Sequence, residues 1–364
     1  MGYTILITGA SGYLGSVLCV DLARDHNIVA LDRLTPSEKL RRAAPSVHWE
    51  KGDVADADCI DWVFRRSLLR GNKIDYVIHF AAYTDFNKKW QDEYSNTNVI
   101  GTRNIIEASF DAGVKRILFA GSIAALEPVP VNMKNVLTEK SIACGEVAYA
   151  KSKAIGETLL FKNSDRVPVV VLRLGGVFTD WCELPPLFSI MKMWSKPFIG
   201  RMMPGEGLSG FPYLHRRDVV RIVRRIIEKN NSLDRFEVLF ASENGCTCQK
   251  DLFPAIRKEC NINFSIKPLN VPLPIARAVL HGKYAFNTVL KRKTYEQAWM
   301  IDYVDRPLVV DTNYTRKKLD WEPTPGLNII ERIPVIMRNF NRHQRRWYIR
   351  NINRNDQKYQ YYPD

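Results

Sequence analysis

The sequence lacks the features that define membrane-spanning and secreted proteins. No stretch of the 364 residues reaches the roughly 18 apolar residues that a membrane-spanning helix needs. The first apolar run is short and is followed at once by glycines, which is not the pattern of a signal peptide. We therefore expect a cytoplasmic protein.

Metal-binding and disulfide patterns are also scarce. The seven cysteines are an odd number and include no CxxC pair, and Cys246-Thr-Cys248 has no histidine beside it. Zinc sites are built from such pairs, and disulfide-stapled proteins carry an even, dense set of cysteines. We expect reduced thiols and no metal site. The sequence also contains no internal repeat and no low-complexity tract.

Acidic residues are outnumbered by basic ones. The 39 Asp and Glu against 53 Lys and Arg leave a net charge of +14, with a pI near 9.4. Such a charge favours an anionic partner, whether a nucleotide, a membrane surface or a nucleic acid, and does not choose among them. The hydrophobic content of 46% is enough for one large α/β core and a smaller lobe.

The most informative motif stands at the start of the chain. An apolar segment over residues 5–8 predicts a strand that runs into three glycines, Gly9, Gly12 and Gly15. Glycines at this spacing permit a tight turn, admit a pyrophosphate to the backbone and let the next helix aim its N-terminus at that anion. A predicted helix over 14–22 and a strand ending at Asp32, where a ribose ligand is expected, complete the pattern of a dinucleotide site.

Strand and helix patterns then alternate along the chain. The predicted strands span 75–82, 116–122 and 167–174, and the predicted helices span 60–69, 98–112 and 149–161. This alternation predicts an α/β fold of the Rossmann type, a doubly wound parallel sheet with helices on both faces.

The alternation ends after Phe178, where prolines and glycines crowd residues 185–212. Late, irregular segments of such a fold cover the carboxyl ends of the strands, so we expect a smaller, loop-rich C-terminal substrate lobe. The expected division is a dinucleotide-binding domain over 1–180 with 211–240 returning to it, a substrate lobe over 181–210 and 241–337, and a basic, aromatic tail over 338–364.

Ser122, Tyr149 and Lys153 form a candidate catalytic centre. Tyr149 and Lys153 are four residues apart on a predicted helix, so their side chains share a face. The ammonium and an oxidised nicotinamide would lower the pKa of the phenol from about 10 toward neutrality, where it can act as acid or base. Ser122 ends a predicted strand, from which its hydroxyl can hold a substrate oxygen. Lys151 lies on another face and is expected to be solvated.

With these motifs the chain resembles the extended branch of the short-chain dehydrogenase/reductase superfamily, which includes the NAD-dependent epimerase/dehydratase and 3β-hydroxysteroid dehydrogenase-like families. The resemblance covers roughly residues 1–335. It is carried by Thr8–Gly15, Gly52–Val54, His79–Ala82, Asn98–Thr102, the strand that ends at Ser122, Tyr149 with Lys153, Leu172–Arg173, Tyr213–Asp218 and Leu319–Pro323.

The resemblance implies NAD as cofactor, with NADP as the alternative. The cofactor-binding residues that it implies are Gly9, Ser11, Gly12, Tyr13, Leu14, Gly15, Asp32, Arg33, Asp53, Val54, Phe80, Ala81, Ala82, Asn98 and Lys153. Asp32 favours NAD because a 2′-phosphate would meet its charge, whereas the neighbouring Arg33 favours NADP. We interpret His79 as a core strand residue.

Departures from the family pattern bear on the substrate. Dehydratases of this branch carry an acidic pair directly after the active-site hydroxyl residue, whereas Ser122 is followed by apolar residues 123–125, so dehydration is not expected. Epimerases place an asparagine and an arginine on the sugar-nucleotide diphosphate, where this chain has Gly175-Gly176 and Phe211-Pro212. The arginines that could compensate are Arg201, Arg216 and Arg217.

The sequence therefore predicts an oxidoreductase that moves hydride between NAD(P) and a secondary alcohol or its ketone. A proline-led apolar segment over 268–293 is similar to one in the steroid-dehydrogenase-like families and has three open interpretations. It covers a lipid-like small-molecule substrate, rests on an anionic membrane surface, or simply packs against the lobe. The first two favour a lipid-like substrate. Two alternatives stay open, a nucleotide-sugar epimerase with tightly bound NAD and a cofactor-binding sensor or scaffold without turnover. The tail suits its own domain or phospholipid better than nucleic acid, and the family implies a homodimer.

Overall fold

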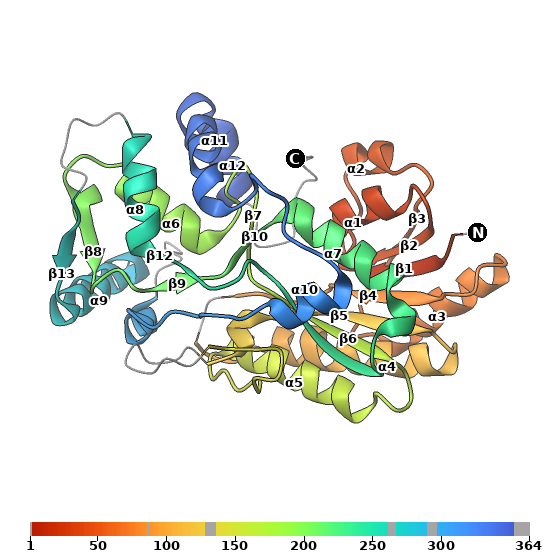
Figure 1. The fold of residues 1–364 in the computed structure, drawn as a ribbon. Coiled ribbons are helices and arrows are strands. Elements are labelled where there is room, and N and C mark those ends of the chain that lie inside the picture. Colours follow the sequence, from red (N-terminus) through yellow and green to blue (C-terminus); the bar gives the residue numbers. More distant parts are fainter. Residues whose placement is uncertain (1, 86–87, 128–135, 261–266, 290–296, 353–364) are drawn as a thin grey trace.

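A seven-stranded parallel sheet forms the centre of the protein. The computed structural model describes residues 2–85, 88–127, 136–260, 267–289 and 297–352. The strand order is β11-β6-β5-β4-β1-β2-β3, and helices cover both faces of the sheet (Figure 1). The strands are β1 (Thr4–Thr8), β2 (Asn27–Asp32), β3 (His48–Lys51), β4 (Tyr76–His79), β5 (Arg116–Ser122), β6 (Val169–Leu174) and β11 (Phe236–Ala241). The predicted doubly wound fold is confirmed.

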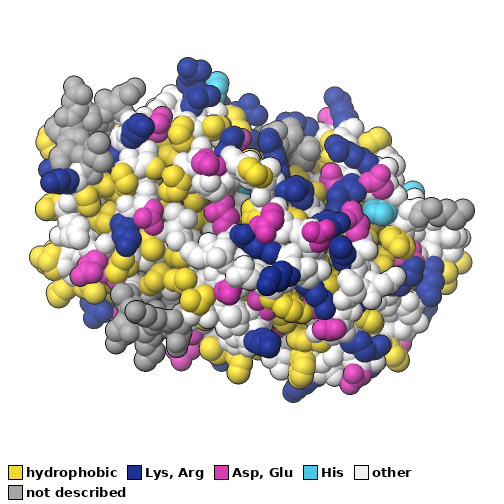
Figure 2. All heavy atoms as spheres, viewed as in Figure 1, with side chains coloured by type: hydrophobic (Ala, Val, Ile, Leu, Met, Phe, Trp, Pro, Cys, Tyr) yellow, Lys and Arg dark blue, Asp and Glu magenta, His cyan; other side chains and the backbone are white. Residues whose placement is uncertain are grey.

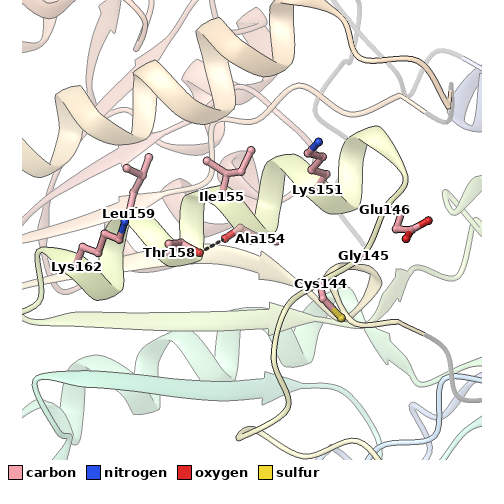
Figure 3. A pocket seen from close by; sticks show the side chains of 9 residues that line it. All are labelled: Cys144, Gly145, Glu146, Lys151, Ala154, Ile155, Thr158, Leu159 and Lys162. Carbon is pink, nitrogen blue, oxygen red and sulfur yellow. Dashed lines mark hydrogen bonds between the residues drawn. The ribbon is translucent and has the colours of Figure 1, made fainter.

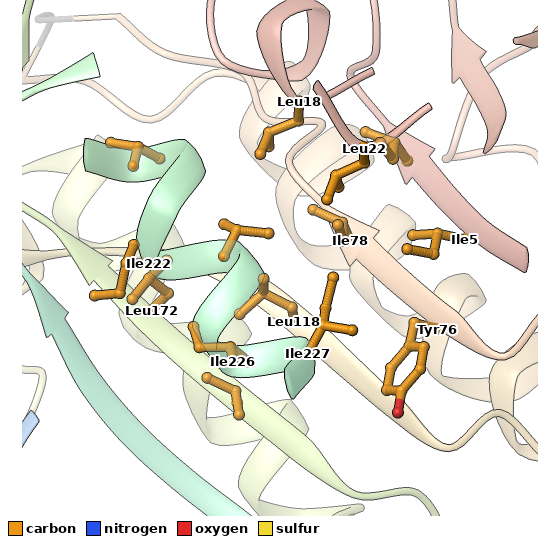
Figure 4. Close-up of a cluster of buried hydrophobic side chains, with 14 of the residues drawn as sticks. Ile5, Leu18, Leu22, Tyr76, Ile78, Leu118, Leu172, Ile222, Ile226 and Ile227 are labelled. Carbon is orange, nitrogen blue, oxygen red and sulfur yellow. The ribbon is translucent and has the colours of Figure 1, made fainter. Parts of the chain in front are cut away.

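The strands are buried on both sides, which explains their nearly continuous apolar sequences. Successive residues of β1 alternate between the two layers, because Ile5 and Ile7 face one core and Leu6 faces the other. Helices α1 (Gly15–Leu22) and α7 (Arg216–Glu228) pack on the first face (Figure 4). Helices α3 (Ala57–Leu69), α4 (Gly101–Asp111) and α5 (Ala148–Lys162) contribute to the second.

The helix predicted over 98–112 begins earlier than expected. A π-helical segment, η1 (Tyr94–Ile100), precedes α4 and packs against α5. The side chain of Asn98 hydrogen-bonds both backbone groups of Tyr83 and so ties this segment to the loop after β4. Such wide turns occur inside helices at functional sites.

The lobe is built from short elements beyond β6. These are β7 (Gly176–Phe178), α6 (Pro185–Trp194), β8 (Met202–Pro204), β9 (Gly210–Phe211), β10 (Tyr213–His215), β12 (Thr247–Cys248), α8 (Gln249–Lys258), β13 (Leu269–Val271), α9 (Leu273–Val289), α11 (Ile329–Arg342) and α12 (Gln344–Ile352). Trp194, Phe253, Ile333 and Trp347 belong to its core. Strands β7 and β10 pair in parallel and connect the lobe to the sheet domain.

One part of the expected lobe packs on the sheet domain instead. Helix α10 (Asn313–Leu319) contacts α7 and β11, and Leu319 and Trp321 lie in the core between α7 and the sheet. The chain therefore returns to the sheet domain at 313–321, before α11 enters the lobe. Local sequence patterns do not indicate whether a helix packs on the sheet domain or in the lobe.

The first part of the basic, aromatic tail folds onto the lobe. Helix α12 buries Trp347, and Arg350 forms a fully buried ion pair with Glu183, with a 2.9 Å contact from Nε to Oε1. Residues 353–364 lie outside the described residues, as do 290–293 of the proline-led segment. None of the helices that the structure describes is long and apolar enough to cross a membrane.

Candidate active site

The glycine loop is a tight turn that leaves room only for backbone. Gly9 has φ +67°, and a Cβ there would lie 2.7 Å from the Ala81 nitrogen. A Cβ at Gly15, the first residue of α1, would lie 2.1 Å from the Gly9 carbonyl oxygen. Only glycine satisfies these positions without rearrangement. The loop delivers the N-terminus of α1 to the carboxyl edge of the sheet, as an anion-binding turn requires.

Asp32 is held against this loop by backbone donors. Its carboxylate accepts hydrogen bonds from the Ser11 nitrogen at 2.8 Å and from the Leu34 nitrogen at 2.9 Å. Burial raises the pKa of Asp32, and the N–H donors of Leu34 and Ser11 and the charge of Arg33 oppose that rise. Arg33 turns toward Asp53, with 3.8 Å between guanidinium and carboxylate. The predicted ribose ligand and its competing cation are therefore neighbours at the end of β2.

A chain of hydrogen bonds joins β1, β4 and α4 beside the glycine loop. Thr8 Oγ1 lies 2.8 Å from His79 Nδ1 and also accepts from the Ala81 nitrogen, while His79 Nε2 lies 3.2 Å from Thr102 Oγ1. Burial, with the charge of Lys153, lowers the pKa of His79 to about 3. His79 is thus a neutral, buried link between β1, β4 and α4.

The side-chain amide of Asn98 is fully engaged in hydrogen bonds. Its Oδ1 accepts from the Tyr83 nitrogen at 2.7 Å, and its Nδ2 donates to the Tyr83 carbonyl and to Ser152 Oγ. Ser152 Oγ in turn donates to the Tyr149 carbonyl at 2.7 Å. Asn98 therefore joins the loop after β4 to the turn of α5 that carries Tyr149.

Helix α5 brings Lys153 to the carboxyl end of β5. Lys153 Nζ donates to the Ala120 carbonyl at 2.8 Å and lies 4.9 Å from the centre of the Phe119 ring. Its side chain is buried, which lowers the pKa of Lys153 to about 8, while the Glu157 carboxylate acts in the opposite direction. Ser122 lies two residues beyond Ala120 on the same strand.

Ser122 and Tyr149 stand at this edge with Lys153. Ser122 is 8% exposed, and its Oγ accepts from the Ala124 nitrogen at the start of the short helix η2 (Ile123–Ala125). Tyr149, in the first turn of α5, is partly exposed. Burial raises the pKa of Tyr94, and the charges of Asp85, Tyr83 and Tyr149 add to that rise. Ser122 thus ends β5, and Tyr149 and Lys153 lie in the first two turns of α5, which packs against β5. Their catalytic roles stay predictions.

A buried ion pair that the sequence motif did not explain supports this junction. The Arg173 guanidinium meets the Glu157 carboxylate at 2.8 Å and donates to the Glu139 and Ser141 carbonyls. Arg173 lies on β6 and Glu157 on α5, so the pair fixes the segment that leads into Tyr149. The Leu-Arg motif thus positions the site without touching it.

Two arginines, Arg216 and Arg306, contact residues that are far away in the sequence. Arg306 reaches Glu127, just beyond η2, at 3.2 Å, so the lobe segment after residue 303 lies over the carboxyl end of β5. Arg216 is buried, with its guanidinium 5.0 Å from the Tyr13 ring and 3.4 Å from the Tyr13 carbonyl. Arg216 therefore packs on the glycine loop through Tyr13.

A groove of about 630 Å³ lies on the outer face of α5, away from Ser122 and Lys153 (Figure 3). Lys151, Ile155, Leu159 and Lys162 line it, and Lys151 is exposed as expected. In the part of the chain that the structure describes, no group of three or more His, Cys, Asp or Glu side chains is placed to hold a metal ion.

The fold and this edge define an extended short-chain dehydrogenase/reductase. A glycine loop leads into α1, a carboxylate ends β2, a serine ends β5, and a tyrosine and a lysine lie at the start of α5. The family model of the NAD dependent epimerase/dehydratase family matches residues 5–239, and the chain belongs to that family.

Curated relatives include enzymes of sugar-nucleotide metabolism. The chain is similar to dTDP-D-glucose 4,6-dehydratase of Mus musculus, with 28% identity over 236 residues, which are 62% of this chain and 64% of that protein. It is also similar to UDP-glucose 4-epimerase of Yersinia enterocolitica, with 33% identity over 168 residues, 43% of this chain and 47% of that one. The chain thus spans less than two thirds of the length of either relative.

Solved structures share the fold over both domain and lobe. A UDP-glucose 4-epimerase of Thermotoga maritima, solved with UDP-glucose, has a TM-score of 0.69 at 19% identity and covers 94% of this chain and 99% of its own. A dTDP-glucose 4,6-dehydratase of Bacillus anthracis, solved with NAD, has a TM-score of 0.68 at 17% identity and covers 95% and 98%. These likenesses show the fold.

The residues at this edge fit NAD, the cofactor of the family. The glycine loop is a cradle that Cβ atoms would fill, Asp32 stands where the ribose hydroxyls are expected, and Lys153 is a buried cation beside the reaction edge. The roles of the individual cofactor-binding residues stay predictions.

Proposed function

We propose that this protein is an NAD-dependent enzyme that oxidises a hydroxyl-bearing carbon of a nucleotide sugar and returns the hydride to that carbon, as an epimerase does. The proposal is supported by the placement of Ser122 at the end of β5 and of Tyr149 and Lys153 at the start of α5, where Lys153 reaches the Ala120 carbonyl of β5. The names of the relatives, which refer to UDP- and dTDP-sugars, favour a nucleotide sugar over the lipid-like ketone expected first.

The chain's own residues supply proton transfer and orientation. When bound, NAD supplies the hydride acceptor. Tyr149 takes the proton from the substrate hydroxyl and later gives it back, because Lys153 stabilises the phenolate by charge. Ser122 donates a hydrogen bond that fixes the substrate oxygen beside the phenol. Asn98 and Arg173 hold α5 in place while this occurs.

The same edge argues against loss of water from the sugar. Elimination needs an acid to protonate the departing hydroxyl, and η2 offers only Ile123, Ala124 and Ala125 after Ser122. The next acid along the chain, Glu127, lies beyond η2 and its C-cap Leu126, not directly after Ser122. We therefore assign epimerisation rather than dehydration.

Arg306 is the cation that we assign to the substrate diphosphate. It stands on the lobe segment over the carboxyl end of β5 and is partly exposed, whereas Arg216 is buried against the glycine loop. A charge-assisted contact of this kind contributes about 1.5–3 kcal/mol. It would replace the arginine that the family pattern places before β10.

Turnover without added cofactor tests the proposal. UDP-, GDP- and dTDP-sugars are incubated with the purified protein, and the sugar stereochemistry is followed by NMR. An epimerase with retained NAD converts one sugar without external NAD, whereas a dehydrogenase consumes added NAD and a sensor does neither. Tyr149→Phe should lower turnover by roughly 10² or more, while Tyr348→Phe, on α12, should leave it unchanged. Turnover of sterol or long-chain ketones alone would overturn the proposal.

One observation favours the second candidate, a lipid-like substrate at a membrane surface. Ile275 and Val279 on α9 are 55% and 54% exposed, beside the exposed Arg277. An apolar stripe with a basic neighbour suits an anionic bilayer. Salt-sensitive cosedimentation with anionic vesicles, lost in Ile275→Glu, would support it, and binding that is unchanged in this variant would contradict it.

We propose a homodimer formed through the outer face of α5. The groove there combines Ile155 and Leu159 with Lys151 and Lys162 (Figure 3). Light scattering after size exclusion should give twice the mass of the chain. Ile155→Glu should give the monomer, while Ile275→Glu, the same change on α9, should not. A monomeric wild type would contradict the proposal.

A further inference from the structure

Two cysteines in the lobe lie close enough to act together. Cys246 and Cys248 are two residues apart, and their Sγ atoms are separated by 4.0 Å. Both side chains are partly exposed, whereas Cys19 and Cys182 are buried. A disulfide needs about 2 Å between the sulfurs, so they must approach by about 2 Å for a bond to form.

The two thiols have unequal surroundings. Cys248 is the N-cap of α8, where its side chain accepts from the Asp251 nitrogen and the Asp251 carboxylate accepts from the Cys248 nitrogen at 2.9 Å. A helix N-terminus favours the thiolate. The hydrogen bond with Cys246 lowers the pKa of Cys248, and burial and the Asp251 carboxylate oppose this change. The same hydrogen bond, together with burial, raises the pKa of Cys246.

The backbone around the pair leaves room for the Cys246 sulfur. Cys248 faces Gly210 across the antiparallel β9–β12 pair, and a Cβ on Gly210 would lie 2.7 Å from Cys246 Sγ. Gly245, with φ +81°, turns the chain immediately before Cys246, and its nitrogen donates to the Val310 carbonyl at 2.8 Å. The pair is therefore presented from an anchored turn, not from a loose loop.

We propose that Cys246 and Cys248 form a thiol–disulfide exchange site that reacts with small-molecule disulfides such as oxidised glutathione. The Cys248 thiolate attacks one sulfur of the small disulfide, forms a mixed disulfide and releases one thiolate, which takes a proton from solvent. Cys246 gives its thiol proton to solvent and attacks the Cys248 sulfur, which displaces the second small thiolate. The two cysteines lose two electrons and the small disulfide gains them.

Formation of the Cys246–Cys248 disulfide should shift β9 and, through it, the segment that carries Arg306. The Leu308 nitrogen donates to the Gly210 carbonyl at 3.2 Å, so β9 and the segment two residues after Arg306 are tied together. We expect oxidation to change the KM for a nucleotide sugar more than kcat. This consequence rests on the proposed function, whereas the exchange chemistry does not.

Peptide mapping tests the chemistry directly, because cleavage after Arg235 and Lys250 gives a fragment, 236–250, that contains these two cysteines alone. The native full-length protein is treated with oxidised glutathione, alkylated and digested. The wild-type fragment should lose two hydrogens and carry neither glutathione nor alkyl label. The exposed Cys144 should carry a glutathione adduct or the label.

Single variants separate the two roles. In Cys246→Ser, Cys248 should accumulate the glutathione adduct, about tenfold faster than Cys144. Cys248→Ser should leave Cys246 largely alkylated, and Cys260→Ser should behave as wild type. The proposal would be overturned if the wild-type fragment stayed alkylated while Cys144 was modified. It would also be overturned if Cys248 of Cys246→Ser formed the glutathione adduct no faster than Cys144. Neither readout depends on enzymatic activity, so failure of the proposed function leaves this test intact.

Discussion

Lys153 is a cation in surroundings that disfavour its charge. Burial lowers the pKa of Lys153 from 10.5 to about 8, so the unfolded chain holds the proton more tightly than the native protein. The buried charge therefore lowers the free energy of unfolding, and this penalty is present in full below pH 8. It disappears as the pH rises from about 8 to 10.5, because the native protein releases the proton before the unfolded chain does. Lys153, which we assign to proton transfer, thus lowers the stability of the folded protein.

Replacement of this lysine should separate stability from activity. In the absence of NAD, Lys153→Met should raise the free energy of unfolding at pH 7, by at most about 3 kcal/mol. The gain should shrink between pH 8 and 10.5, while turnover and NAD binding fall. Urea unfolding across this range measures the difference between the two proteins. A gain that does not change with pH would exclude the titration of Lys153 as its cause.

Asp32 should set the preference for NAD over NADP. Its carboxylate is fixed by the Ser11 and Leu34 nitrogens, so a 2′-phosphate placed there would meet a charge that cannot turn away. Asp32→Asn should shift the ratio of the two dissociation constants toward NADP, as measured by competitive titration. Asp58→Asn, at an exposed carboxylate in the first turn of α3, is the matched control. Tighter binding of NADP by the wild type would show that Arg33 outweighs the carboxylate.

Helix α12 depends on one buried ion pair. Cys182 and Glu183 have φ of +72° and +53°, a backbone conformation that costs of order 1–3 kcal/mol for residues other than glycine. The Glu183 carboxylate accepts from Thr179 Oγ1 at 2.7 Å and from Arg350, and the Glu183 nitrogen donates to the Asn351 side chain. These contacts hold the turn after β7 against α12.

Removal of one partner should therefore cost more than removal of both. Arg350→Met leaves the Glu183 charge buried and should lower the free energy of unfolding by about 3–5 kcal/mol. Arg350→Met with Glu183→Gln should recover a large part of this loss, and Arg346→Met, at an exposed arginine over Trp181, should change little. Urea unfolding at one pH compares the three. A double variant that is no more stable than Arg350→Met would mean that the unpaired Glu183 charge is not the source of the loss.

The sequence predicted the long elements and the reaction edge because their signals are local. The helix that carries Tyr149 and Lys153 and the strand that ends at Ser122 have clear periodicity, and the structure has both. Strands of two or three residues, such as β9 and β12, are too short for a period of two to appear. Contacts such as Arg306 with Glu127 join residues 179 positions apart, so no local pattern indicates them.

At the scale of the whole molecule, the net charge of +14 is not gathered into one patch on the face shown in Figure 2. Lys and Arg are spread over it and interspersed with Asp and Glu. Interactions between such exposed charges fade over about 8 Å at physiological salt. Selective recognition of an anion must therefore come from built sites, such as the glycine loop, rather than from the overall charge.

Binding of NAD should accordingly stabilise the whole protein in a way that excess charge does not. A ligand at one hundred times its dissociation constant adds about 2.7 kcal/mol to the free energy of unfolding, which for a chain of this length raises the unfolding temperature by roughly 4 °C. NADP at the same concentration should raise it less, and inorganic pyrophosphate less still. Gly15→Val, whose side chain would meet the Gly9 carbonyl, should abolish the shift, whereas Gly326→Ala, in open space but at φ +81°, should keep it. Equal shifts with NAD and with pyrophosphate would mean that the protein responds to charge alone.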